Sequence, residues 1–323
     1  MNNFSAARTG PGADNGVMDD ASTGRAPANG LSANGAPVDG GRVPAGVRPG
    51  TGWAIGRAVL TMAGLLGYYA ISLVLLAPLG GPLDSFAERG DVPRMIAGLV
   101  TATIVALSGL VVVWALARFV DHSSLRSIAL VPRAREALPF LGALVATAAV
   151  LMVSALALQP LGLLRAAEPR DGTSVLVFVV VSIVLGLVMQ ALPEELLFRG
   201  YLLRHTPLRI GPAIWLSAAA FGLMHLISSG GQQSLLERVL YLAGPFGFAV
   251  LAGAVAARYR STWASVGVHA GAHLGTMAMT LLGLGSGPVH WVLQGLILSG
   301  LGVLVMRTLP ATELGTDLLP THP

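Results

Sequence analysis

The sequence predicts an all-α protein, a polytopic integral membrane helical bundle of about eight transmembrane helices. Of its 323 residues, 54% are hydrophobic and only 11% are charged, and the mean hydropathy is +0.70. This composition is typical of membrane proteins and not of a soluble core. Eight stretches approach or exceed the roughly 20 apolar residues that a bilayer crossing requires. Strands do not lie against lipid outside a closed barrel, so these stretches are expected to be helices.

The expected crossings are separated by turns and short polar segments. They cover 58–79, 95–117, 138–161, a stretch that starts near 174, 210–228, 239–257, and two more within 261–306 that a Gly-rich turn at 283–288 divides. No repeat of fixed length relates them, and no pair of interrupted helices suggests inverted halves.

Composition also divides the chain into parts. Residues 1–52 are rich in Gly, Ala, Asn, Pro and Asp, which predicts a disordered N-terminal tail. This tail holds no apolar run like that of a cleavable signal peptide, so the first apolar stretch is expected to be a retained anchor. Beyond it we expect N-terminal transmembrane helices over 53–170, a core with most of the polar membrane residues over 171–283, a last transmembrane helix over 284–309 and a C-terminal tail over 310–323.

The basic residues predict the orientation. All twenty are arginine, and fifteen of them would lie on the side of the N-terminus against five on the other side. This bias favours a multi-pass protein of the cell membrane with both termini in the cytoplasm. The high pI reflects these membrane-flanking arginines, so no nucleic-acid partner is expected. Without cysteine, any metal site would have to use His and carboxylate ligands.

Two adjacent carboxylates stand out in the fourth stretch. No charged residue occurs from Gly172 to Pro193, and then Glu194, Glu195 and Arg199 follow. A carboxylate at the bilayer centre costs about 2.5 to 3.5 kcal/mol, so both are expected to face a polar cavity or a partner. Glu195 and Arg199 lie four residues apart on one helix face, where they can pair. Glu194 projects about 100° away and stays free for chemistry.

Three histidines are expected deep in the membrane. His225 lies in the fifth stretch, and His269 and His273 share one face of the seventh. A single membrane histidine often only bonds to a neighbouring helix, but three of them with two glutamates favour a site. His290, at the start of the eighth stretch, is interpreted as an interfacial residue with a structural role.

The opposite face of the seventh stretch carries Gly267, Gly271 and Gly275, a small-residue seam for close helix packing. The fourth and fifth stretches form a hairpin, which brings Glu194 and His225 to similar depths. The sequence therefore predicts an intramembrane active-site cavity, reached from the cytoplasmic side.

Glutamate with histidines is a combination suited to hydrolysis. The carboxylate can take a proton from water, while imidazoles hold that water or stabilise an oxyanion. Alternatively, His225, His269 and His273 could bind Zn²⁺, with an open position for the water.

These residues resemble a known family. Glu-Glu-x-x-x-Arg at Glu194, Glu195 and Arg199, Phe-x-x-x-His at Phe221 and His225, and the late His269 are similar to the motifs of the CAAX prenyl protease and bacteriocin-processing (CPBP or ABI) intramembrane proteases, described as metalloproteases or as glutamate-dependent enzymes. The resemblance implies that Glu194 activates water, His225 helps to hold it and His269 stabilises the oxyanion. Glu195, Arg199 and Phe221 would give structural support.

One residue departs from the family pattern. His273 stands where the family has asparagine. It can donate a hydrogen bond as asparagine does, and it adds a possible third imidazole ligand for zinc. The expected substrate is a membrane-associated peptide or protein. Two other readings remain open: a carrier or proton-coupled channel that relays protons through the same residues, and a catalytically silent membrane scaffold.

Overall fold

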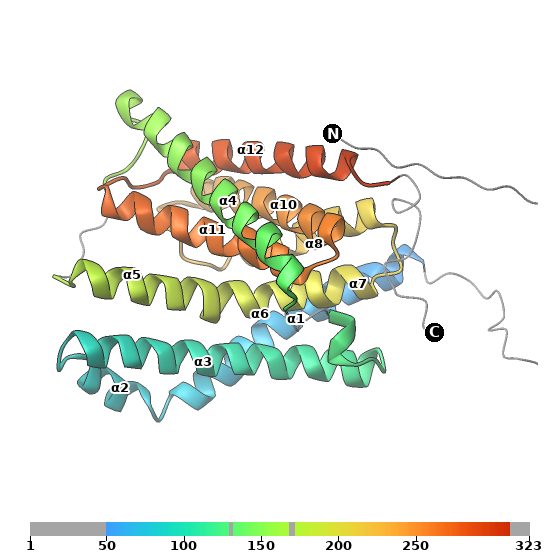
Figure 1. The fold of residues 1–323 in the computed structure, drawn as a ribbon, viewed down its shortest axis with the longest axis horizontal. Helices are drawn as coiled ribbons and strands as arrows, with labels where there is room; N and C mark the ends of the chain where they lie inside the picture. Colours follow the sequence, from blue (N-terminus) through green and yellow to red (C-terminus); the bar gives the residue numbers. More distant parts are fainter. Residues whose placement is uncertain (1–49, 129–131, 168–171, 311–323) are drawn as a thin grey trace, which may run out of the picture. The chain divides into compact units, whose positions relative to one another are not determined.

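All of the described helices belong to one unit of the chain. The computed structural model describes residues 50–128, 132–167 and 172–310. The predicted tails, 1–52 and 310–323, lie outside these ranges except for their innermost residues. Within the described ranges every regular element is a helix, and one isolated β-bridge joins Ala166 to Leu284. The predicted all-α membrane bundle is confirmed (Figure 1).

The helices follow one another with short connections. Their bounds are α1 Thr51–Leu76, α2 Gly80–Ala87, α3 Asp91–Ala115, α4 Ala137–Leu158, α5 Val175–Ile183, α6 Leu192–Glu195, α7 Leu203–His205, α8 Ile210–Met224, α9 Leu235–Tyr241, α10 Ala243–Tyr259, α11 Thr262–Leu281 and α12 Pro288–Arg307. Two π-helical segments, η5 Val184–Ala191 and η6 Leu196–Leu202, join α5, α6 and α7 into one continuous helical run.

The number of membrane-length helices differs from the prediction. Among the described residues, six helices are long and apolar enough to cross a bilayer, not eight: Thr51–Leu76, Asp91–Val120, Ala134–Leu161, Val175–His205, Leu235–Tyr259 and Pro288–Arg307. The other two predicted segments are helices as well, namely α8 and α11. Helix α8 has only 15 residues, about 22 Å at 1.5 Å per residue, which is shorter than the hydrocarbon core.

These two exceptions share a property. Helices α8 and α11 carry or adjoin the three histidines of interest, and many of their residues are buried against other helices. A helix screened from lipid by its neighbours does not need an apolar surface all round. The number of membrane-length helices predicted from the sequence therefore differs at the two helices whose polar residues are concentrated inside the bundle.

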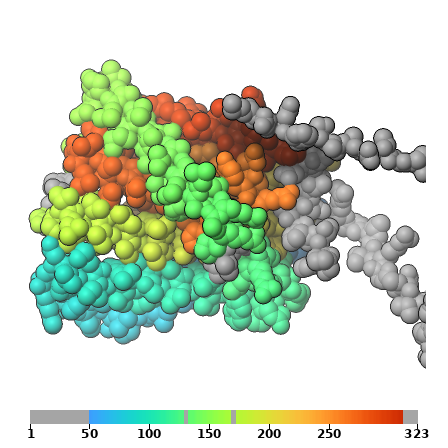
Figure 2. All heavy atoms as spheres, in the orientation of Figure 1, coloured from blue at the N-terminus to red at the C-terminus, as the bar shows by residue number. Residues whose placement is uncertain are grey.

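The predicted glycine seam packs α11 against α4. A Cβ atom at Gly267 or Gly271 would collide with the backbone of Phe140 or Leu144, and one at Gly275 would lie 3.2 Å from the Cα of Ala148. Figure 2 shows α4 (green) running across the surface over α11 (orange). The small residues let the two backbones touch, and this contact fixes the position of the face of α11 that carries the histidines.

A second close helix contact was not expected from the sequence. Gly247 of α10 and Gly295 of α12 face each other, and a Cβ on either would overlap the backbone of the other helix. Two glycine contacts thus hold α11 to α4 and α12 to α10.

Replacing Gly271 with alanine tests the seam. Its added methyl would meet backbone atoms of Leu144 that no side-chain rotation can move, so we expect a loss of about 1 to 3 kcal/mol, typical of overpacking. Thermal unfolding of the purified protein in detergent measures it. Gly300→Ala in α12 is the matched control, because a Cβ there meets nothing within 4 Å. Equal thermal unfolding midpoints of Gly271→Ala and Gly300→Ala would contradict the close packing of α11 on α4.

Candidate active site

The helical run that carries the two glutamates is irregular at the site. Pro193 stands in the first turn of α6 and has no N–H to donate. The flanking π-helical segments η5 and η6 widen the turns on both sides of it. Such π-bulges are rare and occur often at functional sites. They change the angular spacing of the side chains, so a uniform 100° step does not give the directions of Glu194 and Glu195.

Glu195 and Arg199 form the predicted ion pair. Nη1 of Arg199 donates to Oε1 of Glu195 at 2.8 Å, and both side chains have no exposed surface. Nη2 of Arg199 donates to the carbonyl oxygen of Ala249 in α10 at 3.0 Å. The guanidinium therefore ties the end of this helical run to α10.

Phenylalanine rings surround that guanidinium. The ring of Phe221 lies 5.0 Å from the guanidinium carbon of Arg199, and Phe198 and Phe248 lie at 5.9 and 5.8 Å. Aromatic faces attract a desolvated cation. Phe221 also contacts the ring of His225 at 4.6 Å, so it links the ion pair to the histidine expected in the site.

His269 is bonded to the second glutamate. Its Nδ1 lies 3.1 Å from Oε1 of Glu195, the same oxygen that Arg199 contacts. An ionised carboxylate only accepts, so Nδ1 carries the proton and donates it. This contact fixes the ring of His269 and leaves Nε2 for the cavity, as a carboxylate orients histidine in a catalytic triad.

His225 is oriented by the backbone. It follows the last residue of α8, and its Nδ1 donates to the carbonyl oxygen of Phe221 at 2.9 Å. In the neutral ring, Nε2 is then an acceptor. The residue can accept a hydrogen bond from a water molecule in the cavity.

His273 lies one turn beyond His269 on α11. The two rings are nearly parallel, with an interplanar angle of 12° and centroids 5.1 Å apart. A Cβ at Gly186 in the π-helical segment η5 would lie 2.7 Å from the Cβ of His273, so glycine makes room for this imidazole. Nε2 of His273 is buried without a hydrogen-bond partner in the described part of the chain.

The histidines do not fit a zinc ion as they are arranged here. Across residues 50–128, 132–167 and 172–310, no three His, Asp or Glu side chains are grouped as metal ligands. In stacked, nearly parallel rings the in-plane lone pairs run side by side and do not converge on one point. A tetrahedral zinc site needs converging donors about 2.0 Å from the metal. No step of the mechanism below is therefore assigned to a metal.

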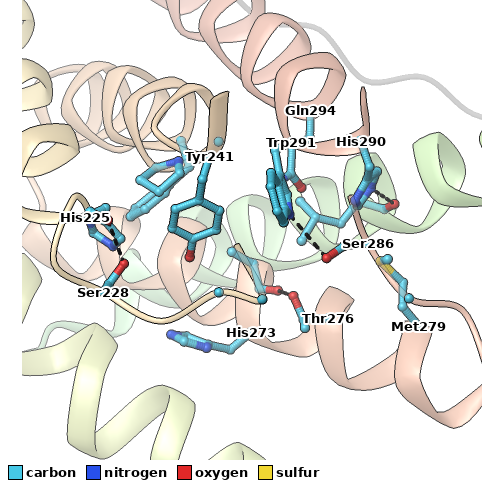
Figure 3. Close-up of a pocket in the computed structure, with 18 of the residues that line it drawn as sticks. His225, Ser228, Tyr241, His273, Thr276, Met279, Ser286, His290, Trp291 and Gln294 are labelled. Carbon is cyan, nitrogen blue, oxygen red and sulfur yellow. Dashed lines mark hydrogen bonds between the residues drawn. The ribbon is translucent and has the colours of Figure 1, made fainter. Parts of the chain in front are cut away.

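One cavity of about 900 Å³ is lined by all four predicted catalytic residues, Glu194, His225, His269 and His273. Figure 3 shows His225 from the end of α8 and His273 from α11 on the wall of this cavity, with Tyr241 between His225 and Trp291. The hairpin and the shared face of α11 therefore bring these residues together as the sequence predicts.

The cavity reaches the end of the bundle opposite the arginine-rich turns. The lining continues through Arg165, Ser228 to Gly231, and Gly285, which belong to connections at one end of the bundle. The arginine-bearing turns at 199–209 and 258–260 lie at the opposite end and contribute nothing to the lining. The cavity thus extends away from the side that the charge count assigns to the cytoplasm.

A cluster of contacts surrounds this end of the cavity. Arg165 bonds to Glu237 at 2.5 Å and to the carbonyl oxygen of Gly231 at 2.7 Å, and its guanidinium lies over the ring of Trp291 at 5.7 Å. Trp291 in turn donates to Ser286 at 3.2 Å. These bonds connect three segments that are far apart in the sequence.

Two tyrosines beside Glu194 were not expected from the sequence. The hydroxyl of Tyr69 donates to Oε1 of Glu194 at 2.9 Å, and that of Tyr68 lies 3.5 Å from the same oxygen. Their signal was a pair of hydroxyls in an otherwise apolar stretch. His290 is buried, and its Nε2 contacts Ser154 and the carbonyl oxygen of Leu151 of α4 at 3.0 and 3.2 Å, in keeping with the structural role expected of it.

Comparison with known families tests the resemblance. Residues 175–275 match the family model described as type II CAAX prenyl endopeptidase Rce1-like. The resemblance seen in the sequence is confirmed. This Rce1-like segment covers about a third of the chain and contains Glu194, Glu195, Arg199, Phe221 and all three histidines of the cavity. No match was found among curated proteins or among solved structures.

The buried ion pair makes a stability prediction. Arg199→Ala leaves Glu195 charged and without its cation, and we expect a loss of about 3 to 5 kcal/mol, measured by thermal unfolding and by the amount of folded protein. The double variant Glu195→Gln with Arg199→Met removes both charges and should recover part of that loss. Arg258→Ala, at an exposed position, is the control. Normal stability of Arg199→Ala would show that the pair is not structural.

Proposed function

We propose that this protein is an intramembrane endopeptidase that uses a water molecule activated by Glu194 to hydrolyse a peptide bond of a membrane-associated peptide or protein. The observation that carries the proposal is that the two carboxylates have different partners. Glu195 is committed to Arg199 and His269, whereas Glu194 forms no ion pair within the described residues and lines a cavity beside three imidazoles. The match of residues 175–275 to a peptidase family supports the same reading.

The geometry suggests how the proton moves. Glu194 takes a proton from water while Nε2 of His225 accepts the second hydrogen of that water as a hydrogen bond, and the resulting hydroxide attacks the peptide carbonyl carbon. The carbonyl becomes an oxyanion. When the C–N bond breaks, Glu194 returns its proton to the leaving amine, so the carboxylate is regenerated.

His269 is placed to stabilise the oxyanion. Its Nδ1 proton is held by Glu195, so Nε2 donates only when the ring carries two protons. In that form Nε2 of His269 would donate to the oxyanion, which is the role that the family resemblance implies.

The carrier or channel reading gains no support from the structure. A relay across the bilayer needs a polar route that reaches both sides. The lining of this cavity includes connections at one end of the bundle alone. With the arginine-rich end in the cytoplasm, as the charge count favours, the substrate would enter from the opposite face of the membrane.

Glu194→Gln tests the proposed base. The amide keeps the size of the side chain and an acceptor oxygen for Tyr69 but cannot take a proton, so hydrolysis should fall at least about 100-fold without loss of stability. Quantitative peptide profiling of membranes from cells with either protein should show precursors that stay uncut in the variant and identify the substrate. Glu88→Gln, at an exposed turn, is the matched control. Unchanged cleavage in Glu194→Gln would overturn the mechanism.

His273→Asn tests the zinc reading. Asparagine restores the residue that the family pattern has, so a metal-free site should keep activity within about tenfold of the wild type. We expect elemental analysis to find no stoichiometric zinc in either purified protein. A wild type that binds one zinc, which His273→Asn loses together with its activity, would contradict the metal-free mechanism.

A further inference from the structure

Helix α1 supplies the hydrogen-bond donors of Glu194. Tyr69 donates to Oε1 at 2.9 Å and lines the cavity, while Tyr68 is fully buried and places its hydroxyl 3.5 Å from the same oxygen. The two rings lie 4.4 Å apart. Both tyrosines lie outside the segment that matches the peptidase family. The contact thus joins the candidate base to a part of the chain for which the comparisons assign no role.

Glu194 depends on these hydrogen-bond donors because no cation among the described residues forms a salt bridge with it. The guanidinium of Arg199, five residues further along the chain, is bonded to Glu195 and to the carbonyl oxygen of Ala249. Within the described residues no salt bridge reaches Glu194. A carboxylate at this depth stays ionised only if hydrogen bonds to its charged form replace the lost hydration. The hydroxyls of Tyr69 and Tyr68 are the side-chain donors found on it.

The two hydroxyls also distinguish the two carboxylate oxygens. Both approach Oε1, and Oε2 forms no hydrogen bond to the described part of the protein. Hydrogen bonds to one oxygen limit rotation of the carboxylate and leave the other oxygen free for water. A bidentate guanidinium would have occupied both oxygens. Two phenols on one oxygen leave the other oxygen available.

We propose that Tyr69, with Tyr68 as the weaker second donor, is the positioning residue of Glu194: its hydroxyl holds Oε1 in place and turns Oε2 toward the attacking water. This role rests on the proposed function of Glu194 as the base. Both hydroxyls contact Glu194, and they act on the reaction through it.

Tyr69→Phe removes the hydroxyl and keeps the ring that contacts Tyr68. We expect kcat to fall about 10-fold to 100-fold, the usual value of a hydrogen bond to a charged group, with KM within about twofold of the wild type. Tyr68→Phe should cost less because its hydroxyl is further from Oε1. Tyr259→Phe, half exposed at the end of α10, is the matched control and should leave both constants unchanged.

Infrared spectroscopy gives a readout that a merely structural tyrosine would not change. The difference spectrum between wild type and Glu194→Gln isolates the carboxylate stretch of Glu194. In Tyr69→Phe that band should shift or be replaced by the stretch of a protonated carboxyl, and in Tyr259→Phe it should stay in place. An unchanged band, or a larger loss of kcat in Tyr68→Phe than in Tyr69→Phe, would overturn the assignment.

The cleavage rates of Glu194→Gln and Tyr69→Phe distinguish the positioning role of Tyr69 from the proposed function of Glu194 on which it rests. If Glu194→Gln cleaves as fast as the wild type, the proposed base and the positioning role are both wrong. If Glu194→Gln is slow but Tyr69→Phe is as fast as the wild type, only the positioning role is wrong. Thermal unfolding midpoints of Tyr69→Phe and Tyr259→Phe should agree, which keeps a folding defect from imitating the result.

Discussion

The buried charge of Glu195 constrains the rest of the site. Its carboxylate has no exposed surface and receives hydrogen bonds from Arg199 of the same helical run and from His269 of α11. A charge removed from water in this way is tolerated only when its partners are held in place. Arg199 is held by Ala249 of α10. One carboxylate thereby ties three helical elements together, and the wall of the cavity is built on them.

Close backbone contacts supply the rigidity that such a pair requires. Gly267 and Gly271 bring α11 against α4, and Gly247 and Gly295 bring α10 against α12. Lipid gives helices little hydrophobic reason to associate, so packing of this kind is what fixes their positions. The polar centre and the glycine seams therefore depend on each other. The ion pair needs fixed helices, and the helices need a surface without protruding side chains.

The local parts of this arrangement were predictable from the sequence. A spacing of four residues was enough to pair Glu195 with Arg199, to place His269 and His273 on one face, and to put the glycines on the other. The family motifs could be recognised in the sequence for the same reason, since each spans only a few consecutive residues. The match over residues 175–275 agrees with them.

The remaining features depend on contacts between distant segments. Tyr69 and Glu194 are 125 residues apart in the chain, and no periodicity connects them. Nothing in the sequence indicated that His269 faces Glu195 and not Glu194, because the π-helical turns on either side of α6 alter the angular positions of both glutamates. The direction of the cavity and the number of lipid-spanning helices likewise depend on which helices are surrounded by others.

The hydrogen bond from α1 to Glu194 bears on which parts of the chain a shortened version of the protein would need. The segment that matches the peptidase family contains the carboxylates and the histidines, yet the hydroxyls bonded to Glu194 come from a helix about a hundred residues earlier. The surroundings of this glutamate therefore extend beyond the matched segment. A minimal version of this protein, whether made by truncation or by transfer of the motif helices to another scaffold, would keep every motif residue. It would still leave Glu194 without the two tyrosine hydroxyls that contact it here.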